Sequence, residues 1–137
     1  MARLLIEECL TLTQIKWAQE SGENNPLVNC GLSVFEYIQL FTNKDHPLLG
    51  TRPTAQSSLR VMVTEFNSDL TLMSEALALY SGMKETHQPQ RGCVGVLQWP
   101  EGLGKVCGIY LGRTWMVRAN RGFVASERNF IKAWEFT

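Results

Sequence analysis

The feature that most constrains the fold is a change in sequence texture near residue 90. Before it, apolar side chains recur at helical spacing; Val34, Ile38 and Phe41, for example, lie on one stripe of a helix. After it, short runs rich in β-branched and aromatic residues are separated by glycines, as expected for strands joined by tight turns. Helices that come first and strands that come later predict an α+β fold.

The expected elements follow from these patterns and from the turn residues between them. Helices are predicted for residues 3–19, for a segment that starts at Asn29 or Ser33 and ends near residue 41, for residues 57–66, and for residues 68–82 with Ser68 as N-cap and Gly82 as stop. Strands are predicted for residues 93–99, 105–112, 114–120 and 122–127, in an antiparallel meander. Residues 84–92 are expected to form a surface loop, and residues 129–136 a short helix or a last strand. N-terminal helices should therefore pack on a small antiparallel β-sheet.

The length and charge of the chain limit the kind of protein it can be. Its 137 residues suit a single domain, 1–137. Thirteen basic and thirteen acidic side chains cancel, so no net positive field attracts nucleic acid, and no nucleic-acid partner is expected. No run approaches the roughly 20 apolar residues of a membrane span, and the start of the chain lacks the apolar stretch of a secretory leader. We therefore expect synthesis in a reducing cytoplasm and no transmembrane segment.

Two groups of side chains suggest binding functions, but a simpler interpretation suits each of them. The arginines of the second half are Arg91, Arg113, Arg118, Arg121 and Arg128, and the wide spread of the last four favours a solvated strand face over a basic binding stripe. The four tryptophans are Trp17, Trp99, Trp115 and Trp134. They are expected to fill the seam between helices and sheet, or a subunit interface, rather than to stack on sugars.

The four cysteines do not have the spacing of a metal site. They are Cys9, Cys30, Cys93 and Cys107, with no CxxC pair and no histidine at zinc-type spacing. A reducing compartment also disfavours disulfides. Most of these cysteines are therefore expected to be small buried apolar residues, and no metal or cofactor is predicted.

Cys30 has a sequence context that could give it a chemical role. It follows a polar residue and precedes an amphipathic run, so it should lie in the first turn of a helix. The N–H groups and dipole of a helix start favour a thiolate. A cysteine nucleophile also needs a base within hydrogen-bond reach, which is most often a histidine. The residues alone leave Cys30 as a nucleophile or a small core residue.

Three segments resemble motifs of NlpC-type cell-wall peptidases, bacterial relatives of the papain fold. VNCGLSVFEYIQL (28–40) is similar to the D-C-S-G-[FL]-V motif that opens the catalytic helix of that family. RGCVGVLQ (91–98) resembles its P-G-D-[LV]-V-[FV]-F strand, and VCGIYLG (106–112) resembles H-V-G-I-Y-[LV]-G, the strand of the catalytic histidine. The likeness runs from about residue 17 to the C-terminus and implies a papain-like (NlpC-like) fold. More narrowly, the chain resembles a divergent papain-like family encoded by tailed bacteriophages among tail-tip and tail-assembly genes.

The resemblance also implies which residues would form the site. Cys30 takes the nucleophile position, with Asn29 where the family has aspartate. Val106 takes the position of the catalytic histidine, with Cys107 beside it, and Cys93 replaces the aspartate of the P-G-D motif. Because valine cannot accept a proton, the base that would activate Cys30 is missing there. General-base help is worth about two to four orders of magnitude in rate, so the site is expected to be degenerate.

The resemblance implies a structural or assembly component of a bacteriophage tail tip or baseplate. Such a protein would be made in the host cytoplasm and would reside in the virion tail, with other tail or baseplate proteins as partners and peptidoglycan as a further candidate. The alternative is an active cysteine peptidoglycan hydrolase, an endopeptidase or amidase, that acts during genome entry and recruits His46 or His87 as base. A third alternative is a cytosolic binding module unrelated to phages.

Overall fold

The computed structural model describes residues 5–19, 26–49, 55–99, 104–119 and 122–137, with the backbone alone for residues 26–30 and 55. Its helices are α1 (Ile6–Gln19), α2 (Pro26–Thr42), α3 (Ala55–Glu65) and α4 (Leu70–Tyr80). Its strands are β1 (Lys84–Thr86), β2 (Val94–Trp99), β3 (Gly104–Tyr110), β4 (Trp115–Arg118), β5 (Phe123–Ser126) and β6 (Phe130–Glu135). The predicted α+β class is confirmed. In the ranges described, no helix combines the length and the apolar character that crossing a bilayer requires.

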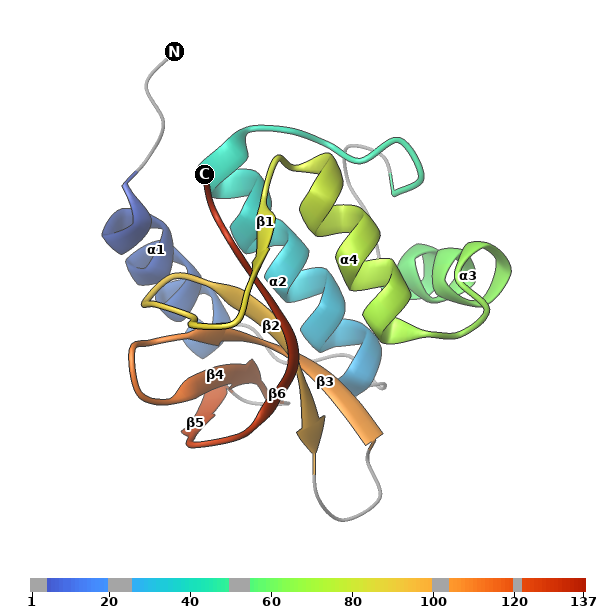
Figure 1. Ribbon diagram of the computed structural model, residues 1–137. Coiled ribbons are helices and arrows are strands. Elements are labelled where there is room, and N and C mark those ends of the chain that lie inside the picture. The colour runs from blue at the N-terminus through green and yellow to red at the C-terminus, as the bar shows by residue number, and fades with distance from the viewer. Residues whose placement is uncertain (1–4, 20–25, 50–54, 100–103, 120–121) are drawn as a thin grey trace.

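The described strands form one antiparallel sheet in the order β1-β6-β2-β3-β4-β5 (Figure 1). Strands β2 to β5 form the predicted meander, each pairing with the next. The expectation of a loop over residues 84–92 is wrong at its start, because Lys84–Thr86 pairs with Glu135–Ala133 of β6. Of the two possibilities for residues 129–136, the strand is correct, and β6 returns across the sheet to lie between β1 and β2.

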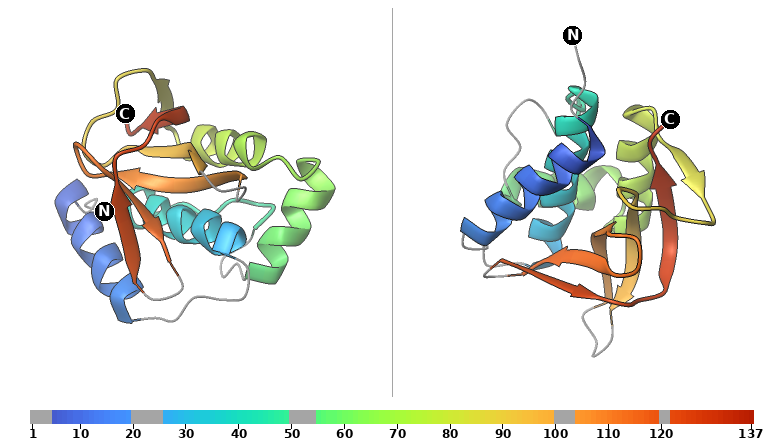
Figure 2. Two further views of the ribbon diagram at one scale, coloured as in Figure 1. Left: turned by 90° about the horizontal axis from the view of Figure 1, so that it is seen from below. Right: turned by 90° about the vertical axis from the view of Figure 1, so that its left-hand side faces the viewer.

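Helix α2 is the central helix, and it contacts α1, α3 and α4 as well as β3 and β4. Figure 1 shows it between α1 and α4, and Figure 2 shows α1 beside β5 at one end of the molecule and α3 at the other. The helix begins at Pro26, so the expectation of a start at Asn29 or Ser33 is wrong. Proline suits the first helical position, because its fixed φ is helical and its missing N–H would have no intrahelical acceptor there. Cys30 therefore lies in the second turn of α2.

Two apolar clusters hold these elements together. The larger one includes buried residues on both faces of the sheet: Trp17 and Trp134 lie in the seam between the helices and the sheet, and Trp115 lies on the opposite face, each almost completely buried. The expectation of tryptophans in the seam is thus confirmed for Trp17 and Trp134. Trp115 is a core residue on the other face of the sheet, and Trp99 is only half-buried. The smaller cluster joins α2 to α4 and to the segment after α2, and partly buried residues of α3 pack against it. Each helix therefore contributes apolar side chains to one or both of these clusters.

The ends of α4 show how local chemistry fixes helix bounds. Asp69, rather than the expected Ser68, is the N-cap, and its carboxylate accepts hydrogen bonds from the N–H groups of Thr71 and Leu72. Ser68 cannot act as this cap because it has a positive φ of 60° in the preceding turn. Gly82 ends the helix as predicted, with a φ of 83° that favours glycine.

Candidate functional site

The N-terminal half of α2 packs against β3. A β-carbon at Gly31 would lie 4.0 Å from the sulfur of Cys107 on β3 and 3.6 Å from Leu70 Cδ1 at the start of α4. Gly31 directly follows Cys30, so the helical turn that carries Cys30 lies beside the strand that the sequence analysis paired with it. For Cys30 itself the structure describes the backbone only, and its side chain lies outside the described part of the chain.

The side chain of β3 that faces α2 beside Gly31 is Cys107. Side chains alternate between the two faces of a strand, and the pairing of β2 with β3 runs without a break. Cys107 therefore points toward the helices, while Val106 points to the opposite face, where its register partner is Leu97. Both residues are buried. The face of β3 turned toward α2 thus presents a thiol, and the aliphatic Val106 lies on the other side of the sheet.

A small cavity lies between α2, α4 and the sheet at this point. Its volume is about 20 Å³, and apolar side chains of α2, together with Leu77 and Trp134, supply most of its lining. The polar atoms that reach it belong to Ser74 and Cys107, whose Oγ and Sγ lie 3.4 Å apart. Neither group is a general base at neutral pH, so the lining of this cavity cannot activate a nucleophile.

His46 lies at the far end of α2 from Cys30. Twelve residues of helix separate Cys30 from Thr42, a rise of about 18 Å. The imidazole of His46 packs at a tilt of 58° against the ring of Tyr80 at the end of α4, with ring centroids 4.7 Å apart, and its Nδ1 accepts the N–H of Leu48 at 3.1 Å. Burial lowers the pKa of His46. His46 is therefore a structural residue of the loop after α2 and cannot serve as a base for Cys30.

His87 lies on the surface at the edge of the sheet. It follows β1, and β6 and β2 separate β1 from β3. Three strand spacings of about 4.8 Å put β1 about 14 Å from β3. His87 is exposed, as expected for a histidine in a loop. Neither described imidazole is therefore brought to the start of α2.

Arg118, expected on a solvated strand face, is instead buried and contacts α2 one turn after Cys30. Arg118 on β4 is only 9% exposed, and its Nη1 donates a hydrogen bond of 3.2 Å to the hydroxyl of Ser33. The expectation of a solvated arginine face is therefore wrong at Arg118, and Arg121 lies outside the described residues. A sequence signal was present, since Arg118 ends the apolar strand TWMVR, but strand alternation alone does not tell which face is covered.

The other three cysteines behave as small core residues. Cys9, Cys93 and Cys107 are buried free thiols, which confirms the expectation for them. Burial raises the pKa of Cys9 and that of Cys93, which favours the uncharged thiol. The sulfur of Cys93 also accepts the N–H of Gln90 at 3.2 Å and closes the turn before β2. Among the described residues, histidine, cysteine and acidic side chains form no group that could hold a metal ion.

In comparisons with known proteins, no family model, no curated protein and no solved structure matches this chain. The likeness to NlpC-type peptidases therefore stays a prediction based on the three sequence motifs. What the fold adds is the contact between the start of α2 and β3, the two segments that carry the first and third of these motifs.

Proposed function

We propose that this chain is a structural or assembly component of a bacteriophage tail tip or baseplate, built on a catalytically degenerate papain-like (NlpC-like) fold. It would reside in the virion tail, in contact with other tail or baseplate proteins. The observation that carries the proposal is the chemistry around the start of α2. Cys107, Ser74 and Arg118 surround this turn, and the described imidazoles of His46 and His87 lie elsewhere.

The outer face of α1 supports a role in assembly. Leu12 and Ile15 are 46% and 49% exposed, and their spacing of three residues puts them on the same side of α1; Leu5, which directly precedes the helix, is 68% exposed. Because these side chains are already about half covered, burying the rest of each one against a partner protein would contribute roughly half of the 1.5–3 kcal/mol that full burial gives. Exposed aliphatic residues that are grouped on one helix face are typical of protein contact surfaces.

An active cysteine hydrolase remains the second candidate because of Arg118. A guanidinium next to a thiol lowers the pKa of the thiol and favours the thiolate. Arg118 contacts α2 through Ser33, one turn after Cys30, so it could raise the reactivity of a thiol at the start of this helix. It cannot accept a proton, however, and so it cannot replace the general base that hydrolysis requires.

Hydrolysis of peptidoglycan separates the two candidates. Purified protein and its Cys30→Ala variant are incubated with purified peptidoglycan, and newly released amino groups and muropeptides are measured. The degenerate fold predicts no release above background for either protein. Release by the wild type that disappears in Cys30→Ala would establish the hydrolase and overturn the proposal.

Virion composition and assembly test the structural role directly. The chain should be found by mass spectrometry in tails purified from virions, and a stop codon early in the gene should give particles with defective tails. Leu12→Glu should reduce the yield of infectious particles, because it places a charge in the proposed contact surface. Leu79→Glu on α4 is the matched control, since Leu79 is somewhat more exposed than Leu12, at 56% against 46%, and lies on another helix. Normal virions without this chain would contradict the structural role.

A further inference from the structure

An open groove of about 900 Å³ lies on the face of the sheet opposite α2 and α4. Cys107 and Ile109 of β3 point toward the helices, so Tyr110 and its register partner Trp115 point the other way, and both of these line the groove. The rest of the lining comes from Pro89 between β1 and β2, from β2, from the turn before β4, and from the segment that joins β5 to β6 together with Phe130 at the start of β6. The volume falls in the range of ligand sites, roughly 300–1,000 Å³. Sequence spacing gives no hint of this groove, because four separate segments build it.

Aromatic rings form the floor of the groove. The ring of Trp115 lies between those of Tyr110 and Phe130, with centroid distances of 4.8 and 6.0 Å. Trp115 is almost completely buried and fixes the position of the other two rings, which are partly exposed to the groove. A ring face carries negative electrostatic potential and therefore attracts C–H groups with slight positive charge. The floor suits a flat ligand that presents C–H groups on one face, as a pyranose ring does.

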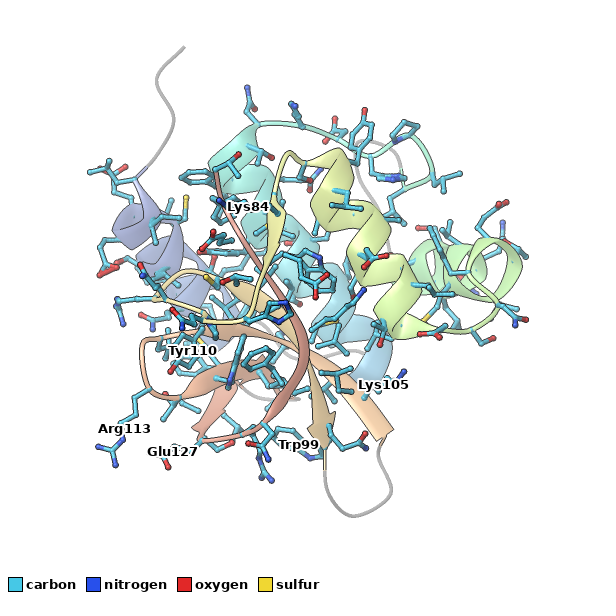
Figure 3. The ribbon with its side chains drawn as sticks, viewed as in Figure 1. Lys84, Trp99, Lys105, Tyr110, Arg113 and Glu127 are labelled. Carbon is cyan, nitrogen blue, oxygen red and sulfur yellow. The ribbon has the colours of Figure 1, made fainter. Side chains whose placement is uncertain are left out.

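Charged and amide side chains form the rim. Arg113 and Glu127 lie side by side in Figure 3 and form an exposed ion pair of 2.6 Å. Glu127 thus balances Arg113. Arg128 stacks 4.5 Å from the centre of the Trp99 ring and donates from Nε to Ser126, and within the described residues it has no acidic partner. Its terminal N–H groups can therefore hold a carboxylate in two parallel hydrogen bonds.

Two amides complete the lining of the groove. Gln98 lines it from β2, where it also contacts the carbonyl of Gly104, and Asn129 lines it from the segment after Arg128. Each amide offers both a donor and an acceptor, which matches the hydroxyl groups of a sugar. An acidic peptide would use the arginine but would have little use for an aromatic floor beside paired donors and acceptors. The groove is also lined by side chains on a sheet face, and not by a free strand edge to which a peptide could add as a further strand.

We propose that this groove binds an acidic saccharide, with a sugar ring on Tyr110 and Phe130 and the sugar carboxylate on Arg128. The site lies on the other side of the sheet from Cys30 and does not depend on the proposed tail function. The groove carries a net charge of +1 from its two arginines and one glutamate, which favours an anionic ligand over a neutral or cationic one.

The test titrates the full chain with a hyaluronan tetrasaccharide, which alternates glucuronate with N-acetylglucosamine, and follows backbone amide shifts by NMR. Saturable binding with a Kd of about 1 mM or tighter is expected, with shifts confined to the groove. Chitotetraose lacks the carboxylate and should bind at least about tenfold more weakly. Losing a hydrogen bond to a charged group is expected to raise the Kd by at least that factor. Tetraglutamate, which has carboxylates but no sugar ring, should also bind more weakly.

Variants assign the binding to the groove. Arg128→Gln and Tyr110→Leu should each weaken tetrasaccharide binding about tenfold, the first by removing the charge and the second by removing the ring face. Asn129→Ala changes an exposed residue of the groove, and its tetrasaccharide binding can be measured if either of these variants fails to fold. Arg60→Gln on α3 is the matched control and should leave binding unchanged. The proposal is overturned if the tetrasaccharide does not bind, or if the groove variants bind it with the same affinity as Arg60→Gln. It is also overturned if chitotetraose or tetraglutamate binds the protein as tightly as the tetrasaccharide does.

Discussion

Replacing Gly31 with alanine is expected to stabilise the fold, although most changes in a packed helix destabilise it. Gly31 lies in the interior of α2, where glycine costs about 1 kcal/mol relative to alanine. The new methyl group would meet Leu70 Cδ1 at 3.6 Å and Cys107 Sγ at 4.0 Å, both ordinary contact distances. It would also extend toward the small cavity beside β3.

The magnitude follows from these three contributions. Helix propensity gives about 1 kcal/mol. Filling part of a cavity of about 20 Å³ adds up to about 0.5 kcal/mol at roughly 24 cal/mol per Å³. The half-buried position of Gly31 limits the further gain from burying the methyl group to about 0.4 kcal/mol, half the usual value. We therefore expect an increase of about 1–2 kcal/mol in the free energy of unfolding.

Urea unfolding followed by circular dichroism measures this change, and the midpoint should rise by roughly 0.5–1 M at an unchanged slope. Two glycine variants serve as controls of opposite sign. Gly82→Ala should destabilise the protein by about 1–2 kcal/mol because its φ is 83°, and Gly95→Ala should destabilise it because a β-carbon there would lie 2.8 Å from the Trp115 ring. If Gly31→Ala is neutral or destabilising while both controls behave as expected, then α2 does not meet β3 in the described way.

Three other changes test separate parts of the structure. Ser33→Ala removes the described acceptor of Arg118 Nη1 in a buried site, and it should lower the free energy of unfolding by about 1–3 kcal/mol in the same urea assay; an unchanged midpoint would contradict the buried contact. In the native protein at neutral pH, a thiol reagent should label at most one of the four cysteines, because Cys9, Cys93 and Cys107 are buried, and all four should react in denaturant; rapid native labelling of two or more would show that the core is open. The pKa of His46 is lowered by burial, so the unfolded chain binds more protons below its ordinary pKa of about 6.5, and stability should fall as the pH drops from 7 through that region; His46→Gln should flatten this part of the profile, and an identical profile would contradict the buried ring.

The sequence predicted the elements well where a long apolar period controlled them. The four helices and the meander from β2 to β5 were identified from apolar spacing and glycine turns. Strand β1 was missed because Lys84–Thr86 has no apolar alternation and is followed by a run rich in glutamine and proline. It is a strand because β6 supplies its partner, with Lys84 paired to Glu135 by an ion pair of 3.4 Å. Such pairing between distant segments overrides local preference.

The candidate site could be predicted in its position but not in its surroundings. The family resemblance predicted that Cys30 and the strand of Val106 and Cys107 form one site, and α2 does pack on that strand. The burial of Arg118 and the packing of His46 depend on which face of each element is covered, and a single sequence does not contain that information. For the same reason the groove on the opposite face was missed, since its residues come together only when β6 returns across the sheet.

The place of β6 between β1 and β2 also sets an order for folding. Strands β2 to β5 can join through short hairpins as soon as they exist, whereas β1 has to wait for a strand made more than forty residues later. Until then, the edge of β2 exposes backbone N–H and C=O groups that another chain could capture. The interval before β6 inserts is therefore when this protein is most exposed to misassembly, and conditions that delay the insertion should favour aggregation over a soluble intermediate.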